Sequence, residues 1–280
     1  MREINDGGLR ARLYEPPAKS TRPGVVVFDG AGGGFPADEP AWQALAEEGH
    51  PTLAVAYFRD RFGGPPELPG TLSRIPLEYA LRSLAWLRDS PENPSGKVVV
   101  IGQSRGAELA LLLGVRCAFL SGVAAFSPSD AIWQSQTYGG EPTTAWTENG
   151  RELPYRRFAC LPGRWPPEAA LSEAYIAGVP DAVIPAERID CPVLLVSSRA
   201  DRIWPSARMA DAVAARRESA GRPVENLQFD DASHLLMGFG DAPVRVSRGA
   251  FTMELGGSEV GTRVARYAGW TALLQFLAQV

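Results

Sequence analysis

The chain has 280 residues and a net charge of −4, and only two of its residues are histidines. A hydrophobic fraction of 45% and a charged fraction of 21% are typical of a globular protein. A pI near 5.4 and the lack of a basic run argue against nucleic-acid binding, which requires a clustered positive face. Two histidines are too few for most three-histidine zinc sites. We therefore expect no metal, no cofactor and no nucleic-acid partner.

The first ten residues, MREINDGGLR, are charged and lack the apolar stretch of a signal peptide. No apolar run approaches the roughly 18–20 residues that a membrane-spanning helix needs. The three cysteines, Cys117, Cys160 and Cys191, stand far apart without C-x-x-C spacing, which argues against a disulfide framework or a zinc knuckle. We expect a cytoplasmic protein with reduced thiols and no membrane span.

Short β-branched runs alternate along the chain with segments of helical period. Strands are expected at residues 25–28, 52–57, 98–101, 123–126, 193–198 and 227–229. Helices are expected at 40–48, at 77–87, through 108–113 from a start just after residue 103, at 206–218 with Ser206 as the cap, and around 270–277. Because most of these strands are apolar throughout, we expect parallel strands covered on both faces. The alternation predicts an α/β fold, a doubly wound and mostly parallel sheet with helices on both faces.

Residues 127–190 do not fit this alternation. They carry tryptophans and tyrosines among Gly, Pro and Thr, with no sustained period. An irregular segment of about 60 residues inside a compact domain is more often functional than a plain connection. We therefore interpret residues 1–280 as one domain with a cap inserted at about 127–190. The candidate substrate-binding residues in this cap are Trp133, Trp146, Tyr155, Arg156 and Arg157.

Residues 102–106 read GQSRG and match the pattern G-x-S-x-G. The motif follows an apolar strand, KVVVIG, and opens a helix, AELALLLG. Such a strand–turn–helix elbow is strained and needs small residues where chain segments approach closely, here at Gly102 and Gly106. The helix N-terminus behind Ser104 supplies partial positive charge where an oxyanion would form. This context predicts that Ser104 is a nucleophile, and the alternative is an ordinary N-cap serine in a glycine-lined turn.

A serine hydroxyl needs a general base, and the chain offers only His50 and His234. His50 stands between Gly49 and Pro51, ahead of Ser104 in the chain, and we interpret it as a surface loop residue. His234 follows the last expected strand at the carboxyl edge of the sheet. Its position gives the chain order Ser, Asp, His of α/β-hydrolases, so we predict that His234 is the base.

The carboxylate that orients the histidine should follow a neighbouring strand. Asp201 stands three residues after Ser198, at the end of the stretch PVLLVSSRAD. Asp230 and Asp231 are alternatives nearer to the histidine in sequence, but they belong to its own strand end and turn. We favour Asp201, which would fix the imidazole tautomer and stabilise the imidazolium without taking the proton.

The glycine-rich segment FDGAGGGF, residues 28–35, follows the first expected strand of the parallel sheet. It does not match a dinucleotide-binding fingerprint, because Phe35 stands where the third glycine is needed, and no P-loop Lys-Ser/Thr follows. In a hydrolase such a loop supplies one backbone N–H of the oxyanion hole, and the elbow supplies the other. We predict the Arg105 amide as the elbow donor and the Ala31 or Gly32 amide as its partner; the alternative is a flexible turn.

Five longer stretches carry a resemblance beyond the elbow motif: IPLEYALRSLAWL, GQSRGAELALL, AWTENGRELPY, IPAERIDCPVLLVSSRADRIWPS and the ending GG…ARYAGWTALLQF. Together, over about residues 22–279, the chain resembles the C-terminal catalytic domain of acyl-CoA thioester hydrolases and bile acid-CoA:amino acid N-acyltransferases. The resemblance implies an α/β-hydrolase fold and the triad Ser104, Asp201 and His234, the same set as the residues indicate.

Two departures from the family pattern stand out. Larger members have an N-terminal β-sandwich, whereas only a short segment precedes the core here, and Ser233 stands where the family usually has Gly. Members that transfer acyl groups to an amine tend to have Cys as the nucleophile. The resemblance, together with Ser104 at that position, therefore favours hydrolysis, in one domain without the sandwich.

The first functional hypothesis is a serine hydrolase that cleaves an acyl-CoA or acyl-carrier-protein thioester through an acyl-enzyme. Four cap arginines, Arg151, Arg156, Arg157 and Arg164, could contact CoA phosphates. The second hypothesis is an esterase or lactonase, because MREINDGGLRARLYEPPA followed by PGVVVFDG resembles the opening of dienelactone hydrolases. An acyltransferase or cyclising thioesterase would use the same triad, whereas a non-catalytic binding module would not need it. The oligomeric state stays open, with a homodimer among the alternatives.

Overall fold

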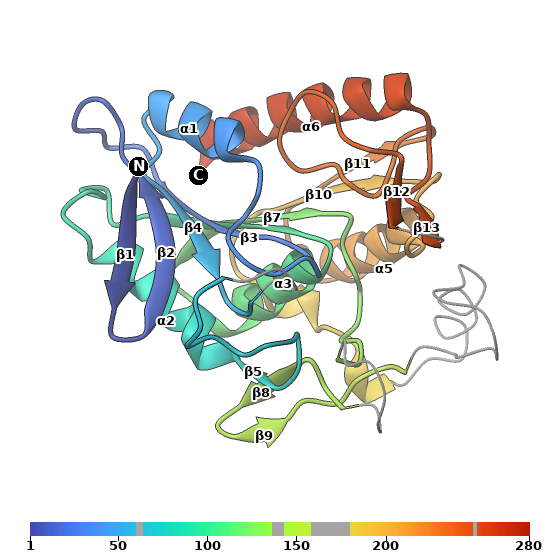
Figure 1. Ribbon diagram of the computed structural model, residues 1–280, viewed down its shortest axis with the longest axis horizontal. Helices are drawn as coiled ribbons and strands as arrows, with labels where there is room; N and C mark the ends of the chain where they lie inside the picture. The colour runs from blue at the N-terminus through green and yellow to red at the C-terminus, as the bar shows by residue number, and fades with distance from the viewer. Residues whose placement is uncertain (60–63, 136–142, 158–179, 249–250) are drawn as a thin grey trace.

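The computed structural model describes residues 1–59, 64–135, 143–157, 180–248 and 251–280 (Figure 1). Its centre is an eight-stranded sheet in the order β1-β2-β4-β3-β6-β7-β10-β11. Six strands, from β4 to β11 in that order, are parallel to their neighbours, and the β1–β2 hairpin joins β4 antiparallel. The strands span Arg2–Asp6 (β1), Leu9–Tyr14 (β2), Gly24–Phe28 (β3), Thr52–Ala56 (β4), Val98–Gln103 (β6), Leu120–Phe126 (β7), Val193–Ser198 (β10) and Val224–Phe229 (β11). The predicted α/β class is thereby confirmed.

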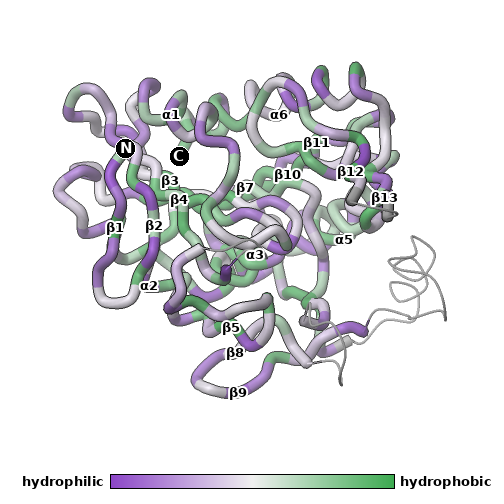
Figure 2. Tube along the Cα trace, in the orientation of Figure 1, coloured by the Kyte–Doolittle hydropathy of each residue, from purple (hydrophilic) through white to green (hydrophobic). Residues whose placement is uncertain are grey.

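Alternating side chains along the buried strands divide the core into two layers. In β3, Val25 and Val27 belong to a cluster with α1 and α6, whereas Val26 and Phe28 belong to a cluster with α2, α3 and α5. The hydrophobic colour follows the central strands in Figure 2. The helices span Glu39–Glu47 (α1), Leu77–Arg88 (α2), Arg105–Arg116 (α3), Ser206–Ser219 (α5) and Glu259–Gln279 (α6). The sheet is therefore covered on both faces, as its apolar strands predict.

The structure differs from the sequence-based expectation at several elements. The β1–β2 hairpin is an addition, and α6 begins at Glu259 rather than near residue 270. Ser206 is the first residue of α5, and Pro205 holds the cap position. The Ser206 hydroxyl lies instead 3.4 Å from the Ser198 carbonyl oxygen, so it joins the helix to the end of β10.

The segment predicted as a cap contains short elements below α3 in Figure 1. β8 (Trp146–Glu148) pairs with β5 (Ile75–Pro76) and with β9 (Arg151–Glu152). Two short 3₁₀ helices follow at Pro180–Ala182 (η1) and Ala186–Arg188 (η2). Residues 136–142 and 158–179 of the segment lie outside the described residues, so the cap as a unit stays a prediction.

A second hairpin, β12 (Arg245–Arg248) with β13 (Phe251–Glu254), lies between β11 and α6 in the chain. No helix in the described part of the chain is both long and apolar enough to cross a membrane.

Candidate active site

Ser104 occupies the turn between β6 and α3. Its φ of 58° with ψ of −117° is a strained backbone conformation for a residue other than glycine. A Cβ at Gly102 would lie 2.0 Å from the Gly106 carbonyl oxygen, and a Cβ at Gly106 would lie 2.3 Å from the Phe28 carbonyl oxygen, so both positions require glycine. The Ser104 side chain makes no capping hydrogen bond, and this argues against the ordinary N-cap serine. The turn has the form of a nucleophile elbow.

His234 and Asp201 lie side by side at the carboxyl ends of β11 and β10. His234 Nδ1 is 2.8 Å from Asp201 Oδ2, and both side chains are almost fully buried. The other Asp201 oxygen accepts hydrogen bonds from the Ile203 amide at 2.9 Å and the Trp204 amide at 3.3 Å. The carboxylate is therefore held in a fixed orientation, and the Nδ1–H tautomer leaves Nε2 of the imidazole as the acceptor of a proton.

The two alternative acids are engaged elsewhere. Asp230 forms an exposed ion pair with Arg199 at 2.5 Å. Asp231 accepts a hydrogen bond from the Ser258 hydroxyl at 2.6 Å, at the start of α6. The geometry therefore favours Asp201 as the partner of His234, as the sequence predicts.

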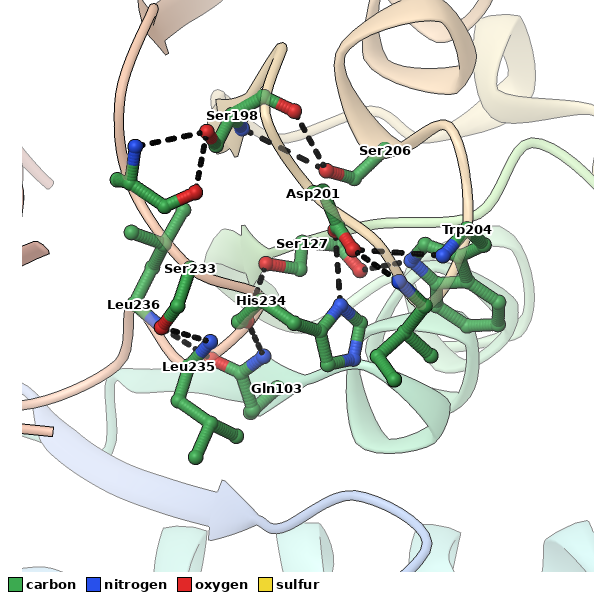
Figure 3. A network of polar contacts seen from close by, with 12 residues as sticks. Gln103, Ser127, Ser198, Asp201, Trp204, Ser206, Ser233, His234, Leu235 and Leu236 are labelled. Atoms are coloured by element: carbon green, nitrogen blue, oxygen red, sulfur yellow. Dashed lines mark hydrogen bonds and ion pairs between the residues drawn. The ribbon is translucent and has the colours of Figure 1, made fainter. Parts of the chain in front are cut away.

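Gln103, the residue before Ser104, connects the elbow to the segment that follows β11 and carries His234, residues 230–240, which we call the histidine loop (Figure 3). Its Nε2 donates to the His234 carbonyl at 2.7 Å, and its Oε1 accepts from the Met237 amide at 2.9 Å. The Ser127 hydroxyl, at the end of β7, donates to the same His234 carbonyl at 2.7 Å. These buried contacts place the histidine loop beside the turn that carries Ser104.

Residues 255–257 pack against both the histidine loop and the segment between β10 and α5 that carries Asp201, residues 199–205, which we call the acid loop. The Leu255 carbonyl accepts hydrogen bonds from the His234 amide at 2.9 Å and the Arg202 amide at 3.3 Å. Gly256 has a φ of 95°, and a Cβ there would lie 1.9 Å from a backbone carbonyl oxygen of the acid loop. Gly257 has a φ of 59°, and a Cβ there would lie 2.4 Å from a backbone carbon of the histidine loop. This close packing fixes the relative position of Asp201 and His234.

The glycine loop after β3 begins against the nucleophile. A Cβ at Gly30 would lie 3.1 Å from the Ser104 Cβ and 3.6 Å from its Oγ. Ala31 and Gly32 follow and are both exposed, and a Cβ added at Gly32 would meet no atom of the described residues within 4 Å. The Arg105 amide lies in the first turn of α3, where helix geometry leaves N–H groups without an intrahelical partner. Both predicted donor segments thus border Ser104, and their role as an oxyanion hole stays a prediction.

Asp29 shapes the start of this loop. Its carboxylate accepts hydrogen bonds from the Gly30 amide at 2.6 Å and the Ala37 amide at 3.4 Å. Burial raises the pKa of Asp29, and the two amide hydrogen bonds only partly offset that effect. The Gly30 amide is therefore already engaged by Asp29, so the amides of Ala31 and Gly32 are better placed to meet a substrate.

The candidate substrate-binding residues divide by burial. Trp133 and Trp146 are fully buried, and their indole N–H groups donate to the Ser129 hydroxyl and to Glu108, an arrangement typical of packing residues. Arg156 is also buried and lies 3.3 Å from an Asp130 oxygen.

The remaining candidates lie nearer to solvent. Tyr155 is half-buried, whereas Arg157 and Arg151 are exposed. Arg164 lies outside the described residues. Substrate contact by any of these side chains stays a prediction, and the exposed arginines suit it better than the buried one.

A cavity of about 300 Å³ adjoins the site on the α1 and α6 side. Three of its lining residues are the chain neighbours of the residues above: Asp29 precedes Gly30, Gln103 precedes Ser104, and Leu235 follows His234. Apolar side chains, including Trp42, Met237 and Phe239, form much of the remaining wall. Among the described residues, no group of three or more His, Cys, Asp or Glu side chains could hold a metal ion.

Sequence reasoning missed the side chains that hold the loops together. Gln103 stands in the variable position of G-x-S-x-G, and its side-chain contacts reach residues more than 130 positions away, which no local pattern reveals. Glu108 shares the first turn of α3 with Arg105 and is fully buried. A carboxylate inside the apolar run AELALLLG is the one signal that could have indicated its buried role.

Comparison with solved structures places the fold among α/β-hydrolases. A dienelactone hydrolase described as putative, from Klebsiella pneumoniae subsp. pneumoniae, superposes with a TM-score of 0.60 and 16% identity, and the match covers 97% of this chain and 93% of that one. Est1E from Butyrivibrio proteoclasticus, solved with ferulic acid, gives a TM-score of 0.60 at 12% identity over 99% of this chain and 100% of that one. At these identities the likeness establishes the fold alone.

Curated relatives are acyl-coenzyme A thioesterases. The mitochondrial acyl-coenzyme A thioesterase 2 of Mus musculus is 25% identical over 225 residues, which are 78% of this chain and 46% of that protein. Acyl-coenzyme A thioesterase 1 of Homo sapiens is 27% identical over 227 residues, 78% of this chain and 50% of that protein. The chain thus spans about half the length of these relatives. The sequence model described as BAAT / acyl-CoA thioester hydrolase C terminal matches residues 75–280, and the chain therefore belongs to that family.

Proposed function

We propose that the protein is a serine hydrolase that cleaves acyl thioesters through Ser104, His234 and Asp201. One observation carries the proposal: a histidine paired with a buried aspartate at 2.8 Å is bound through Gln103 to the strained turn of Ser104. Family membership supports the thioester as the bond that is cleaved. The exposed glycine loop beside Ser104 supports an acyl carbonyl as the group that approaches.

In the first half of the reaction, Ser104 Oγ attacks the thioester carbonyl carbon while His234 Nε2 takes the hydroxyl proton. The carbonyl oxygen becomes an oxyanion, which accepts hydrogen bonds from the Arg105 amide and the Ala31 or Gly32 amide. The C–S bond then breaks, and the imidazolium returns its proton to the leaving thiolate. The product is a free thiol and an acyl-enzyme on Ser104.

In the second half, water attacks the acyl-enzyme. His234 takes a proton from the water, a second tetrahedral intermediate forms, and its collapse returns the proton to Ser104 and releases the acid. Asp201 stabilises the imidazolium in both halves because its carboxylate already faces Nδ1 and is held by two amides.

The family and the site both support an acyl thioester as the substrate. The exposed Arg151 and Arg157 can contact phosphates of CoA. A carrier-protein thioester would reach the same serine. The cytoplasmic compartment and a homodimer stay predictions.

The test compares initial rates on a chain-length panel of acyl-CoA substrates with rates on matched nitrophenyl esters. We expect thioesters to be cleaved faster than the esters, and Ser104→Ala to lower kcat by roughly 10⁴-fold or more. Thioester rates no higher than ester rates would contradict thioester specificity. Full activity in Ser104→Ala would contradict the nucleophile.

The same assay carries a matched pair for the acid. Asp201→Asn should lower turnover strongly, because an amide facing Nδ1 favours the wrong imidazole tautomer. Asp231→Asn should leave turnover nearly unchanged, since Asp231 contacts Ser258 and not the histidine. The reverse result would identify Asp231 as the acid.

A further inference from the structure

A buried tyrosine holds the backbone of the glycine loop beside Ser104. Tyr57 follows β4 and is 2% exposed. Its hydroxyl donates to the Asp29 carbonyl at 2.7 Å and lies 3.3 Å from the Gly30 carbonyl oxygen. These carbonyls belong to the peptide units that lead into Ala31. The position of the loop amides therefore depends on the Tyr57 hydroxyl.

A buried ion pair lies in α3, directly after the turn of Ser104. Arg105 and Glu108 occupy the first turn of α3, where Arg105 Nη2 lies 3.4 Å from Glu108 Oε1. The same guanidinium donates to the Trp133 carbonyl at 3.1 Å. Burial raises the pKa of Glu108 to about 7 despite the adjacent Arg105. A buried ion pair is weak evidence for stability, because apolar residues of similar volume often replace it without loss.

Trp146 joins the two sides. Its Nε1–H donates to Glu108 Oε1 at 2.5 Å, and its ring stacks on the Tyr57 ring with centroids 5.9 Å apart and an interplanar angle of 29°. Contacts therefore run without a break from the glycine loop through Tyr57, Trp146 and Glu108 to Arg105. This path connects the two segments that carry the oxyanion donors of the proposed function.

We propose that Tyr57 and Glu108 are positioning residues that set the spacing between the two oxyanion donors, with Trp146 as the buried connection between them. The inference rests on the proposed function. In this proposal neither Tyr57 nor Glu108 touches the substrate, and both act through the backbone segments that they support. A rigid, hydrogen-bonded support of this kind matters because donors misplaced by about 1 Å can cost roughly 10²-fold in rate.

Tyr57→Phe tests the loop side, with Tyr79→Phe as the matched control. Tyr79 also donates its hydroxyl to a backbone carbonyl, that of Ala56 at 2.6 Å, and it accepts a hydrogen bond from the Arg10 amide at 3.0 Å, so these two partners are in β4 and β2. On the best substrate of the wild-type protein, we expect Tyr57→Phe to lower kcat by about 10- to 100-fold with KM nearly unchanged. Binding of a trifluoromethyl ketone analogue, which forms an oxyanion on the enzyme, should weaken by the same factor.

Tyr79→Phe should leave kcat and ketone binding unchanged. Equal behaviour of the two variants, or a fall in kcat with no loss of ketone binding, would overturn the proposal. Full activity of Ser104→Ala would instead overturn the proposed function, so the two failures are distinguishable.

A pair of substitutions at Glu108 provides an independent test should Tyr57→Phe fail to fold. Glu108→Gln keeps an oxygen that can accept the Trp146 N–H, whereas Glu108→Leu removes it. We expect Glu108→Gln to retain kcat and ketone binding within several-fold, and Glu108→Leu to lose both by about tenfold or more. Equal ketone binding in the two variants would contradict a positioning role.

Discussion

The two histidines of the chain occupy different environments. His234 faces Asp201 at the edge of the sheet, whereas His50 is completely buried between α1 and β4. The expectation of a surface position for His50 is wrong. Its Nδ1 lies 2.9 Å from the Pro23 carbonyl oxygen, and its buried Nε2 has no hydrogen-bond partner among the described residues. The Gly49 turn, with a φ of 93°, directs His50 inward, which the pattern Gly-His-Pro does not reveal.

Burial lowers the pKa of His50 below its ordinary value, so this imidazole binds a proton less readily in the folded protein than in the unfolded chain. As the pH falls from 8 through about 6.5, the unfolded chain takes up a proton at this histidine more readily than the folded protein does, and the free energy of unfolding decreases. His50→Asn can still donate to the Pro23 carbonyl but does not titrate, so its free energy of unfolding should lack this pH dependence. In urea unfolding at pH 8.0, 6.5 and 5.5, the free energy of unfolding of the wild type should fall relative to that of His50→Asn as the pH falls. A difference that stays constant over this range would contradict the prediction.

At the scale of elements, α6 supports the loop that carries His234. The guanidinium of Arg266 is buried and donates to backbone carbonyls of that loop, those of Leu235, Met237, Phe239 and Gly240. It also pairs with Asp38 at 2.5 Å, just before α1. One side chain thus joins two helices to the segment that follows His234.

Arg266→Leu removes these donors and leaves Asp38 without its partner. We expect it to lower the free energy of unfolding by about 3–5 kcal/mol and to lower activity, since the histidine loop loses its support. Arg263→Leu is the matched control on the same helix. Its partner Asp241 is exposed, so the loss should stay within about 1 kcal/mol. Urea unfolding of both variants checks this, and equal losses would refute the special role of Arg266.

The elements differ in how well the sequence predicts them. The buried strands β3, β6 and β10 and the helix α2 carry their signals locally, in apolar runs and in 3.6-residue periodicity. The β1–β2 hairpin was missed although Asp6-Gly7-Gly8 is a turn signal, and the β8–β9 hairpin turns at Asn149-Gly150 in the same way. Both hairpins are short and largely polar, so their pattern is weak.

At the scale of the whole molecule, the sheet topology brings the site together. β3, β6, β7, β10 and β11 are parallel neighbours, so the glycine loop, Ser104, Ser127, Asp201 and His234 follow strands that all end at one edge. Chain order and strand ends were enough to predict the three candidate catalytic residues. The supports could not be predicted, because Gln103, Tyr57 and Arg266 act through residues far away in sequence, whose proximity only the folded chain creates.

Detection of an acyl-enzyme on Ser104 is the most direct test of the proposed chemistry. Wild-type protein mixed with its best acyl-CoA substrate and acid-quenched within milliseconds should gain the mass of one acyl group. Peptide mapping should place that mass on Ser104, and Ser104→Ala should gain none. Acylation of a cysteine or of another residue in place of Ser104 would contradict the triad.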